Sequence, residues 1–464
     1  MAMALCLALP ACGSALTPEQ RADVLGAPGA GGDGAATGGD SGAATAGSAS
    51  GGGPGGAQGG APGGGSNGTN GGPGGGRGPV TCQGTGGATA PGVTASKIKI
   101  ANVSDVSGPV QGLFESAQQA VKAYVGYANS TGGVCGRTLD LMALDSRTDS
   151  RGDQEATARA CSQAFALVGS MSAYDQGGAA TASGCGIPDL RAVTTTAQRQ
   201  KTAVTYGVNS NKVNFQSTAV ADHFKSKFPA AAGKAAFLYL NSEVTKQNEA
   251  SFVRAFTGRG FSFVYEQAID VADFNYAPYV VQMKDRGVRY VQWLGSYQHA
   301  ARLLKAMKQQ GFKPDVFVMD PVAYDANFVK QAGDAAEGMA VFTNTALLEE
   351  GGGNAELRLY RTWLARVAPG AAPDYFGFFA WGAAKLFVEL AAKVGPNLTR
   401  KALLDAVKGV HAYTANGLFS PQDVGGKRTA KCWAFIRLKG GRWVREAPGS
   451  GFRCGQLVNT GVGG

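Results

Sequence analysis

From about residue 93 onward, the chain alternates short apolar runs with stretches whose apolar side chains recur at helical spacing. Residues 98–103 are predicted to form a strand, and the amphipathic stretch that follows predicts a helix ending at the turn of Gly132 and Gly133. Further strands are expected at 139–144, 165–168 and 191–193, with a helix at 154–163. This alternation is typical of a parallel sheet that helices cover on both faces.

A second series of the same kind begins near Ala235. Its expected strands are 236–240, 261–267, 288–294 and 316–319, and its expected helices are 248–257, 278–286 and 300–310. Two series predict two lobes with a cleft between them, and therefore an α/β fold with two doubly wound parallel-sheet lobes. Because ligands bind beyond the carboxyl ends of the strands in such sheets, the strand-to-helix loops should carry the function.

Three hinge crossings are predicted to join the lobes, near residues 206–211, 342–346 and 412–417. The third is needed because the amphipathic helix expected at 375–394 has to return to the first lobe. Lobe 1 is then expected to contain residues 93–208 and 346–414, and lobe 2 residues 209–345 and 415–464.

The N-terminal part differs sharply from the rest of the chain. Residues 1–11 form a short apolar run, predicted to be a signal peptide, and Leu9-Pro10-Ala11-Cys12 has the form of a lipobox, in which Cys12 would be lipidated. No Lys or Arg precedes the run, so a chance cysteine is the alternative. Residues 12–92 are rich in glycine and other small residues and predict a disordered tether. No later stretch is expected to span a bilayer.

Cysteine usage agrees with an exported protein. With Cys6 in the leader and Cys12 lipidated, six cysteines remain, an even number in a compartment where disulfides persist. Cys161 and Cys185 each precede a strand-like run, so they lie at one sheet edge if those strands are neighbours. We predict the pairs Cys161–Cys185 and Cys432–Cys454, which leaves Cys82 with Cys135. Buried free thiols are the alternative.

Charge and motifs argue against nucleic-acid binding and catalysis. The formal net charge is +10, but the basic residues are dispersed and do not interleave with aromatic residues. The sequence shows no hydrolase, zinc-protease or phosphate-loop motif, and its three histidines lack metal-ligand spacing. We therefore expect no catalytic residue, no metal and no cofactor. A hydrolase that uses a pair of carboxylates would leave no motif and stays an alternative.

Several short motifs, taken in order, resemble the leucine/isoleucine/valine-binding, type I periplasmic-binding-protein family. Each motif is weak by itself, but their order and spacing extend over roughly residues 98–444. The motifs are Ser107-Gly108-Pro109, Gly132-Gly133-Val134-Cys135-Gly136-Arg137, Leu167-Val168-Gly169-Ser170, Gly186-Ile187-Pro188, Ala332-Gly333-Asp334-Ala335-Ala336-Glu337-Gly338 and Gly417-Leu418-Phe419-Ser420.

The resemblance implies a ligand site built from both lobes. In amino-acid-binding members, hydroxyls and backbone N–H groups of two lobe 1 loops hold the ligand carboxylate, and the matching residues are Ser172, Ala173, Thr194 and Thr195. The ligand ammonium would meet Asp320, and Tyr297 would close the lobe 2 side. The alternatives are that the hydroxyl residues cap helices, that Asp320 opens a turn and that Tyr297 packs in the core.

The same resemblance implies the function and the partners. We expect a binding protein that delivers a small amino acid, or a related zwitterion or amide, to the permease and ATPase subunits of an ABC importer. The protein is expected outside the cytoplasm as a lipid-anchored monomer. A ligand-sensing receptor on the same fold is the alternative that the sequence leaves open.

Overall fold

The computed structural model describes residues 82, 84, 86–350 and 352–463. The predicted signal peptide, the lipidation at Cys12 and nearly all of the predicted tether lie outside these residues. Residues 86–92, expected at the end of the tether, pack on lobe 1 instead. Cys82 is bonded to Cys135, and the Arg137 guanidinium donates to the carbonyl of Gly87 at 2.8 Å. These two contacts explain why the folded region begins before residue 93.

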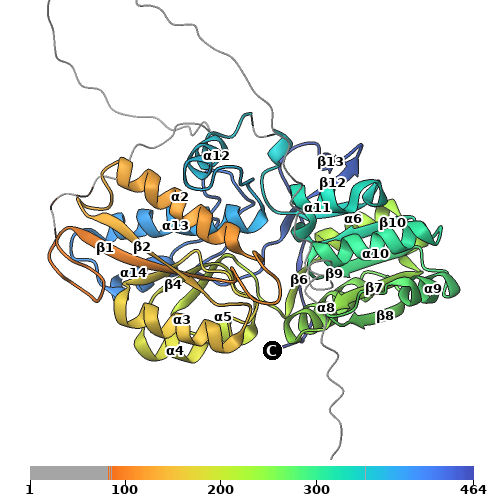
Figure 1. Ribbon diagram of the computed structural model, residues 1–464, viewed down its shortest axis with the longest axis horizontal. Helices are drawn as coiled ribbons and strands as arrows, with labels where there is room; N and C mark the ends of the chain where they lie inside the picture. The colour runs from red at the N-terminus through yellow and green to blue at the C-terminus, as the bar shows by residue number, and fades with distance from the viewer. Residues whose placement is uncertain (1–81, 83, 85, 351, 464) are drawn as a thin grey trace, which may run out of the picture. The chain divides into compact units, whose positions relative to one another are not determined.

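Lobe 1 contains a parallel sheet with the strand order β2-β1-β3-β4-β5 (Figure 1). Strands β3, β4 and β5 are buried along their whole length; β3 is a continuous apolar run, whereas β4 includes the buried, paired Asp189 and Arg191. The strands are β1 (Lys97–Ser104), β2 (Thr138–Asp145), β3 (Ala166–Val168), β4 (Asp189–Val193) and β5 (Thr205–Asn209).

Helices cover both faces of this sheet, as predicted. On one face α2 (Glu115–Ser130) and α13 (Tyr375–Val394) share a core with β1 and β4, and α12 (Ala355–Val367) and α14 (Arg400–Lys408) join it. On the other face lie α3 (Ser150–Gln163) and α4 (Ala179–Cys185), while α5 (Ala197–Lys201) precedes β5. Asp149 caps α3 and Thr196 caps α5, each by accepting a backbone N–H bond.

Helix α13 has the bounds expected from the sequence but is not amphipathic. It is buried nearly all round, because α2 covers one side and the sheet the other. By length and composition alone this helix would also be apolar enough to cross a membrane, contrary to the expectation that no later stretch is. Inside the protein 78% of its most apolar window is buried, so it is the central core helix of lobe 1.

Lobe 2 contains a mixed sheet with the strand order β13-β12-β11-β10-β9-β7-β8. The strands from β7 to β11 are parallel, while β12 and β13 add to one edge antiparallel. The strands are β7 (Ala235–Leu240), β8 (Phe263–Ile269), β9 (Tyr290–Leu294), β10 (Val316–Met319), β11 (Ala340–Thr343), β12 (Cys432–Lys439) and β13 (Arg442–Ala447).

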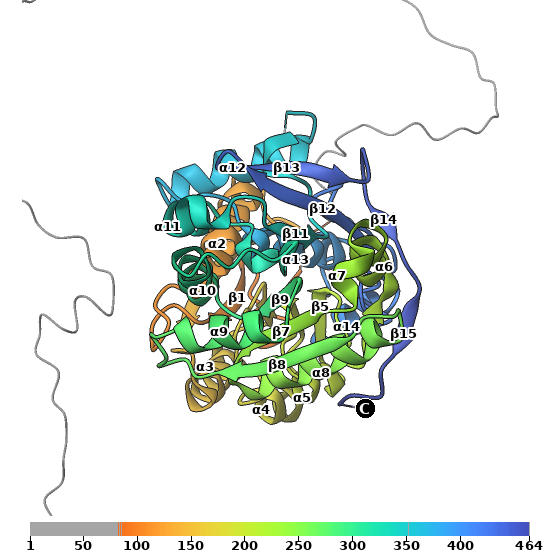
Figure 2. The same cartoon turned by 90° about the vertical axis from the view of Figure 1, so that its right-hand side faces the viewer.

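The helices of lobe 2 follow the predicted alternation. They are α6 (Thr218–Lys227), α7 (Pro229–Ala232), α8 (Glu243–Thr257), α9 (Ala277–Asp285), α10 (Tyr297–Gln309) and α11 (Ala326–Ala332), with short 3-10 helices η1 (Pro321–Ala323) and η2 (Gly333–Ala336). A third 3-10 helix, η3 (Leu348–Glu350), follows β11 and contacts the cores of both lobes through Leu348. Figure 2 shows the last strands, β14 (Arg453–Cys454) and β15 (Leu457–Asn459), running beside α6. Strand β15 pairs antiparallel with β6 (Phe215–Ser217).

The described chain crosses between the lobes three times, as predicted, but the third crossing is later than expected. The first two crossings follow β5 and β11. Residues 415–428, expected in lobe 2, pack on lobe 1, because Leu418, Phe419 and Val424 are buried in its core. Phe419 stacks on Phe379 of α13 with ring centroids 4.6 Å apart. The crossing itself comes just before β12, where the N–H of Ala430 donates to Ser210 of the first crossing.

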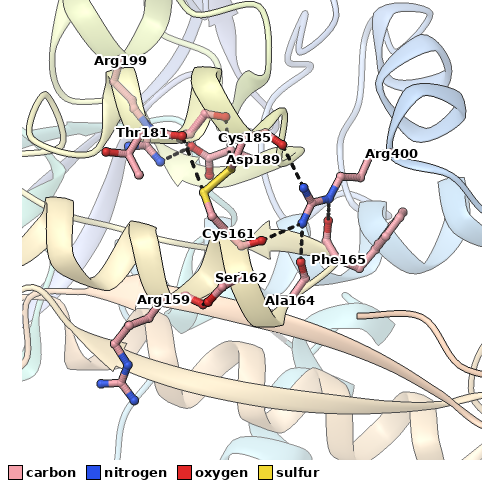
Figure 3. The surroundings of a disulfide bond; sticks show 11 residues. Arg159, Cys161, Ser162, Ala164, Phe165, Thr181, Cys185, Asp189, Arg199 and Arg400 are labelled. Atoms are coloured by element: carbon pink, nitrogen blue, oxygen red, sulfur yellow. Dashed lines mark hydrogen bonds and ion pairs between the residues drawn. A yellow bond between two sulfur atoms is a disulfide. The ribbon is translucent and has the colours of Figure 1, made fainter. Parts of the chain in front are cut away.

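All three predicted disulfides are present among the described residues, namely Cys82–Cys135, Cys161–Cys185 and Cys432–Cys454. Cys161 lies in α3 and Cys185 ends α4, so each precedes one of the neighbouring strands β3 and β4, as the sheet-edge argument required. Figure 3 shows this disulfide with the guanidinium of Arg400 beside it.

Candidate ligand-binding site

The loops that follow the lobe 1 strands meet at one edge of the sheet. Gly169, directly after β3, has a φ of +62° and lies so close to Val121 of α2 and Ala380 of α13 that a side chain there would collide with them. This turn directs residues 170–173 across the carboxyl end of β1, where the N–H of Met171 donates to Val103. The loop after β3 therefore lies where a ligand binds in sheets of this kind.

The structure brings the predicted lobe 1 residues together. Ser172 and Thr194 are buried, and the hydroxyl of Thr195 donates to the carbonyl of Ser172 at 2.8 Å, which joins the two loops. However, two N–H groups expected to face a ligand carboxylate already have acceptors. Ala173 donates to the carboxylate of Asp105 at 2.8 Å, and Thr195 donates to that of Asp175 at 2.9 Å. A carboxylate ligand would compete with two buried aspartates for these donors.

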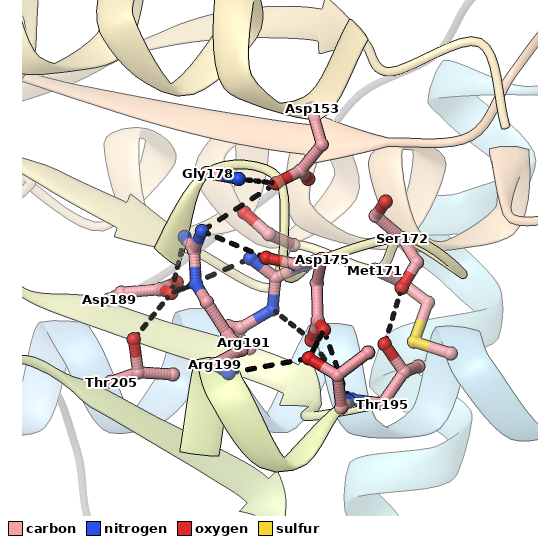
Figure 4. Close-up of polar contacts among 12 residues, drawn as sticks. Asp153, Met171, Ser172, Asp175, Gly178, Asp189, Arg191, Thr195, Arg199 and Thr205 are labelled. Atoms are coloured by element: carbon pink, nitrogen blue, oxygen red, sulfur yellow. Dashed lines mark hydrogen bonds and ion pairs between the residues drawn. The ribbon is translucent and has the colours of Figure 1, made fainter. Parts of the chain in front are cut away.

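Asp175 belongs to a buried layer of charged side chains beneath the loops (Figure 4), and Arg191 of this layer acts on the charge of Asp105. Asp175 faces Arg191 at 3.7 Å, and Asp189 lies 2.7 Å from a guanidinium nitrogen of Arg199, all with fully buried side chains. Burial raises the pKa of Asp105, and the hydrogen bonds that its carboxylate accepts from Ala173 and Ser146 partly offset this rise. The layer holds the loops in place, and its aspartates are paired with the buried guanidiniums of Arg191 and Arg199.

A cavity of about 330 Å³ lies between the lobes, lined by described residues of both. Lobe 1 contributes the start of α2 and residues 370–376, which lead into α13. Lobe 2 contributes the start of α10 and the segment from η1 to the start of α11. The lining includes Glu115, Ser116, Asp374, Tyr375 and Phe376 of lobe 1, and Tyr297, Gln298, Tyr324 and Asp325 of lobe 2.

The two predicted lobe 2 residues differ in position. Tyr297 lines the cavity at the first turn of α10 and also packs edge-on against Phe328. Asp320 is absent from this lining, which comprises described residues alone, and it caps η1 by accepting from the N–H of Val322 at 3.3 Å. Burial raises the pKa of Asp320 to about 7, and its charge adds to the raised pKa of Tyr375, which does line the cavity. Asp320 thus lies next to the cavity lining.

A serine–histidine pair was not expected from the sequence. Ser296 lines the cavity, and its Oγ lies 2.5 Å from Nδ1 of His299. Nε2 of His299 is 3.0 Å from the carbonyl oxygen of Val271, which can only accept, so Nε2 carries the proton and Nδ1 accepts from Ser296. Burial lowers the pKa of His299. A neutral carbonyl in place of a carboxylate offers little stabilisation to an imidazolium, so the pair is better suited to holding the start of α10 than to catalysis.

The sequence also did not predict that Asp325 and Asp374 line the cavity. Each precedes a helix and caps it, Asp325 at α11 and Asp374 at α13. An aspartate just before an apolar helical run is a recognisable capping signal. That signal places the residue at a helix start, but only the packing of the two lobes places both helix starts at one cavity.

Comparisons with known proteins agree with this architecture. Residues 97–442 match the family model described as periplasmic binding protein. A branched-chain amino acid transporter substrate-binding protein from Streptococcus pneumoniae, solved with isoleucine, is 17% identical over 76% of this chain and 100% of its own, with a TM-score of 0.64. No curated protein matches the chain in sequence.

Two further solved structures are similar in fold. A branched-chain amino acid ABC transporter protein from Thermus thermophilus with bound valine is 16% identical over 77% of this chain and 97% of its own, with a TM-score of 0.66. A fatty acid ABC transporter substrate-binding protein from Thermomonospora curvata is 20% identical over 77% of this chain and 93% of its own, also with a TM-score of 0.66. Proteins with different ligands therefore share this fold.

Proposed function

The chain belongs to the periplasmic binding protein family, and from this premise we propose that it is an extracytoplasmic receptor that captures a small polar solute between its lobes and delivers it to an ABC importer. The observation that carries the proposal is the cavity between the lobes, lined from both sides at the carboxyl ends of the strands. A solute held there contacts both lobes at once, so binding favours the closed arrangement over the open one.

For the solute, we propose an amino acid or a related amide. The bound isoleucine and valine in two similar structures support this class. Tyr297 supplies an aromatic wall of the cavity on lobe 2, whereas Ser172, Ala173, Thr194 and Thr195 of the lobe 1 loops are not among its described lining residues. The N–H groups of Ala173 and Thr195 are engaged by aspartates, so a ligand carboxylate would depend on hydroxyls more than on backbone donors.

The partners proposed are the permease and ATPase subunits of the importer, with the protein held at the membrane as a monomer through a lipid on Cys12. The lipobox-like Leu9-Pro10-Ala11-Cys12 supports the anchor, and the three disulfides among the described residues suit a compartment outside the cytoplasm. A sensory role would use the same cleft but a different membrane partner.

A thermal-shift screen against amino acids, amides, urea and aromatic acids tests the proposal, because a bound solute raises the melting temperature by mass action. The variant Ser116→Trp places a large side chain at the cavity and should abolish the shift. Ser130→Trp, on the exposed end of the same helix, is the matched control and should keep it. Binding that survives Ser116→Trp unchanged would place the ligand elsewhere.

A further inference from the structure

The cavity between the lobes is acidic in a protein that is basic overall. The chain carries a formal net charge of +10, yet the described lining includes three carboxylates, Glu115, Asp325 and Asp374, and neither Lys nor Arg. A lining drawn without regard to charge from such a chain would contain more basic than acidic side chains. The imbalance therefore marks the kind of ligand that the cavity can neutralise.

Two of the carboxylates belong to opposite lobes, and both of their charges raise the pKa of Tyr297. Asp374 stands at the start of α13 on lobe 1, and Asp325 at the start of α11 on lobe 2. Burial, and then the charges of both aspartates, raises the pKa of Tyr297 to about 12. The charge of Asp325 also adds to the effect of burial in raising the pKa of Asp374 to about 6. The two carboxylates therefore repel each other across the cleft.

Helix capping uses one oxygen of each carboxylate. Oδ1 of Asp374 accepts from the N–H of Gly377 at 2.7 Å, and Oδ1 of Asp325 accepts from the N–H of Asn327 at 2.6 Å. Oδ2 of each residue takes no part in these bonds. Capping accounts for the presence of an aspartate at each position, but it does not account for two unneutralised charges at one cavity.

Other groups in the lining suit a polar cation. Oε1 of Gln298 on lobe 2 is a buried atom without a hydrogen-bond partner among the described residues, and Gln298 lines the cavity. The rings of Tyr297, Tyr324 and Phe376 complete the wall. Aromatic rings attract a cation through their electron-rich faces, and an unpaired glutamine oxygen accepts a hydrogen bond from an amine or a guanidinium.

Resting on the proposed solute-binding function, we infer that the ligand is a cation, with an amine, guanidinium or quaternary ammonium group that no carboxylate of its own neutralises, and that this group lies between Asp325 of lobe 2 and Asp374 of lobe 1. Such a group neutralises two charges that otherwise repel, so it favours closure of the cleft. A ligand whose net charge is negative would instead be repelled by these two aspartates.

Calorimetry on the full chain tests the inference with probes matched in shape. Arginine and citrulline differ at the end of the side chain, where a guanidinium is replaced by a neutral urea group. The panel also includes agmatine, putrescine, choline, isoleucine and glutamate. We expect at least one cationic probe to bind about tenfold or more tightly than citrulline, isoleucine and glutamate. If citrulline, isoleucine or glutamate binds as tightly as the best cationic probe, the inference is overturned and the proposed function stands. If no probe binds, the inference fails, and the thermal-shift screen decides the proposed function separately.

Two substitutions assign the effect to the aspartates. Asp325→Asn and Asp374→Asn keep an oxygen for helix capping and remove the charge, and each should weaken binding of the best cationic probe about tenfold. Asp149→Asn is the matched control, because Asp149 caps α3 in the same way, accepting from Gly152 at 2.7 Å, and is not part of the cavity lining. The melting temperature of each unliganded variant reports its folding. Unchanged affinity in both folded cavity variants would overturn the inference.

Discussion

The side-chain amide of Asn209 donates a hydrogen bond of 2.6 Å to the hydroxyl of Tyr375. Asn209 ends β5, where the chain first leaves lobe 1, and Tyr375 begins α13 and lines the cavity. A second amide, from Asn344 just after β11, lies 3.5 Å from the Asn209 side-chain oxygen. The first two crossings and the cavity wall are thus connected by side chains that are nearly fully buried.

Removing either partner of this bond should destabilise the protein. Asn209→Ala and Tyr375→Phe each leave a buried polar group unpaired, which costs about 1–3 kcal/mol. In the double variant neither partner is left without the other. The free energy of unfolding that the double variant loses should therefore be smaller than the sum of the two single losses, by about 1 kcal/mol. Urea unfolding of the four proteins measures this cycle. Strictly additive losses would mean that the two groups do not interact.

Arg400 should be irreplaceable by lysine. Its guanidinium donates to the carbonyls of Cys161, Ala164, Phe165 and Cys185, at 2.7–3.2 Å, and so satisfies the ends of α3 and α4 beside their disulfide. A lysine ammonium cannot reach all four. Arg400→Lys should cost about 2–3 kcal/mol in urea unfolding. Arg361→Lys, an exposed arginine with one such bond, is the control and should cost about 0.5 kcal/mol or less.

The contribution of Asp320 and Asp374 to the free energy of unfolding should fall as the pH rises from about 4 to about 7. Burial raises the pKa of Asp320 to about 7 and that of Asp374 to about 6, above the unfolded value of about 4. Between the unfolded and the folded pKa, the folded state binds more protons than the unfolded state. The stabilisation that the two carboxyl groups provide is therefore complete below pH 4 and is lost as the pH rises through the folded pKa. Asp320→Asn should reduce the slope of the free energy of unfolding against pH, by at most about 1.4 kcal/mol per pH unit. Melting curves without ligand across this range measure the effect. A slope that is identical in wild type and variant would contradict the assignment.

Much of the fold was predictable because it depends on local patterns. Strands β1 to β4 of lobe 1 and β7 to β10 of lobe 2 lie at the predicted strand positions, whereas β5 contains Thr, Gly and Asn and was not located from the sequence. The bounds of α13 follow from its apolar content between Asp374 and Gly395. The third crossing was placed wrongly because residues 412–417 have the composition of a turn, and Ala415 and Asn416 do adopt positive φ there. What keeps the chain on lobe 1 after this turn is the packing of Phe419 on Phe379, a contact between distant parts of the sequence.

The candidate site was predictable only in part for the same reason. The loops of Ser172 and Thr195 follow strands and could be located from the sequence. The N–H groups of Ala173 and Thr195 donate to Asp105 and Asp175. These contacts could not be predicted, because strand order sets the positions of the two aspartates relative to the loops. The cavity side chains Asp325 and Asp374 come from two helix starts that are adjacent only when the lobes face each other.

The central claim is that a solute held between the lobes brings them together. Spin labels on Lys122→Cys of α2 and Lys330→Cys of α11, both exposed, report the distance between the lobes in a chain whose Cys6 and Cys12 are replaced by serine. Adding the solute that binds in calorimetry should shorten this distance and narrow its distribution. An unchanged distribution at saturating solute would contradict the account.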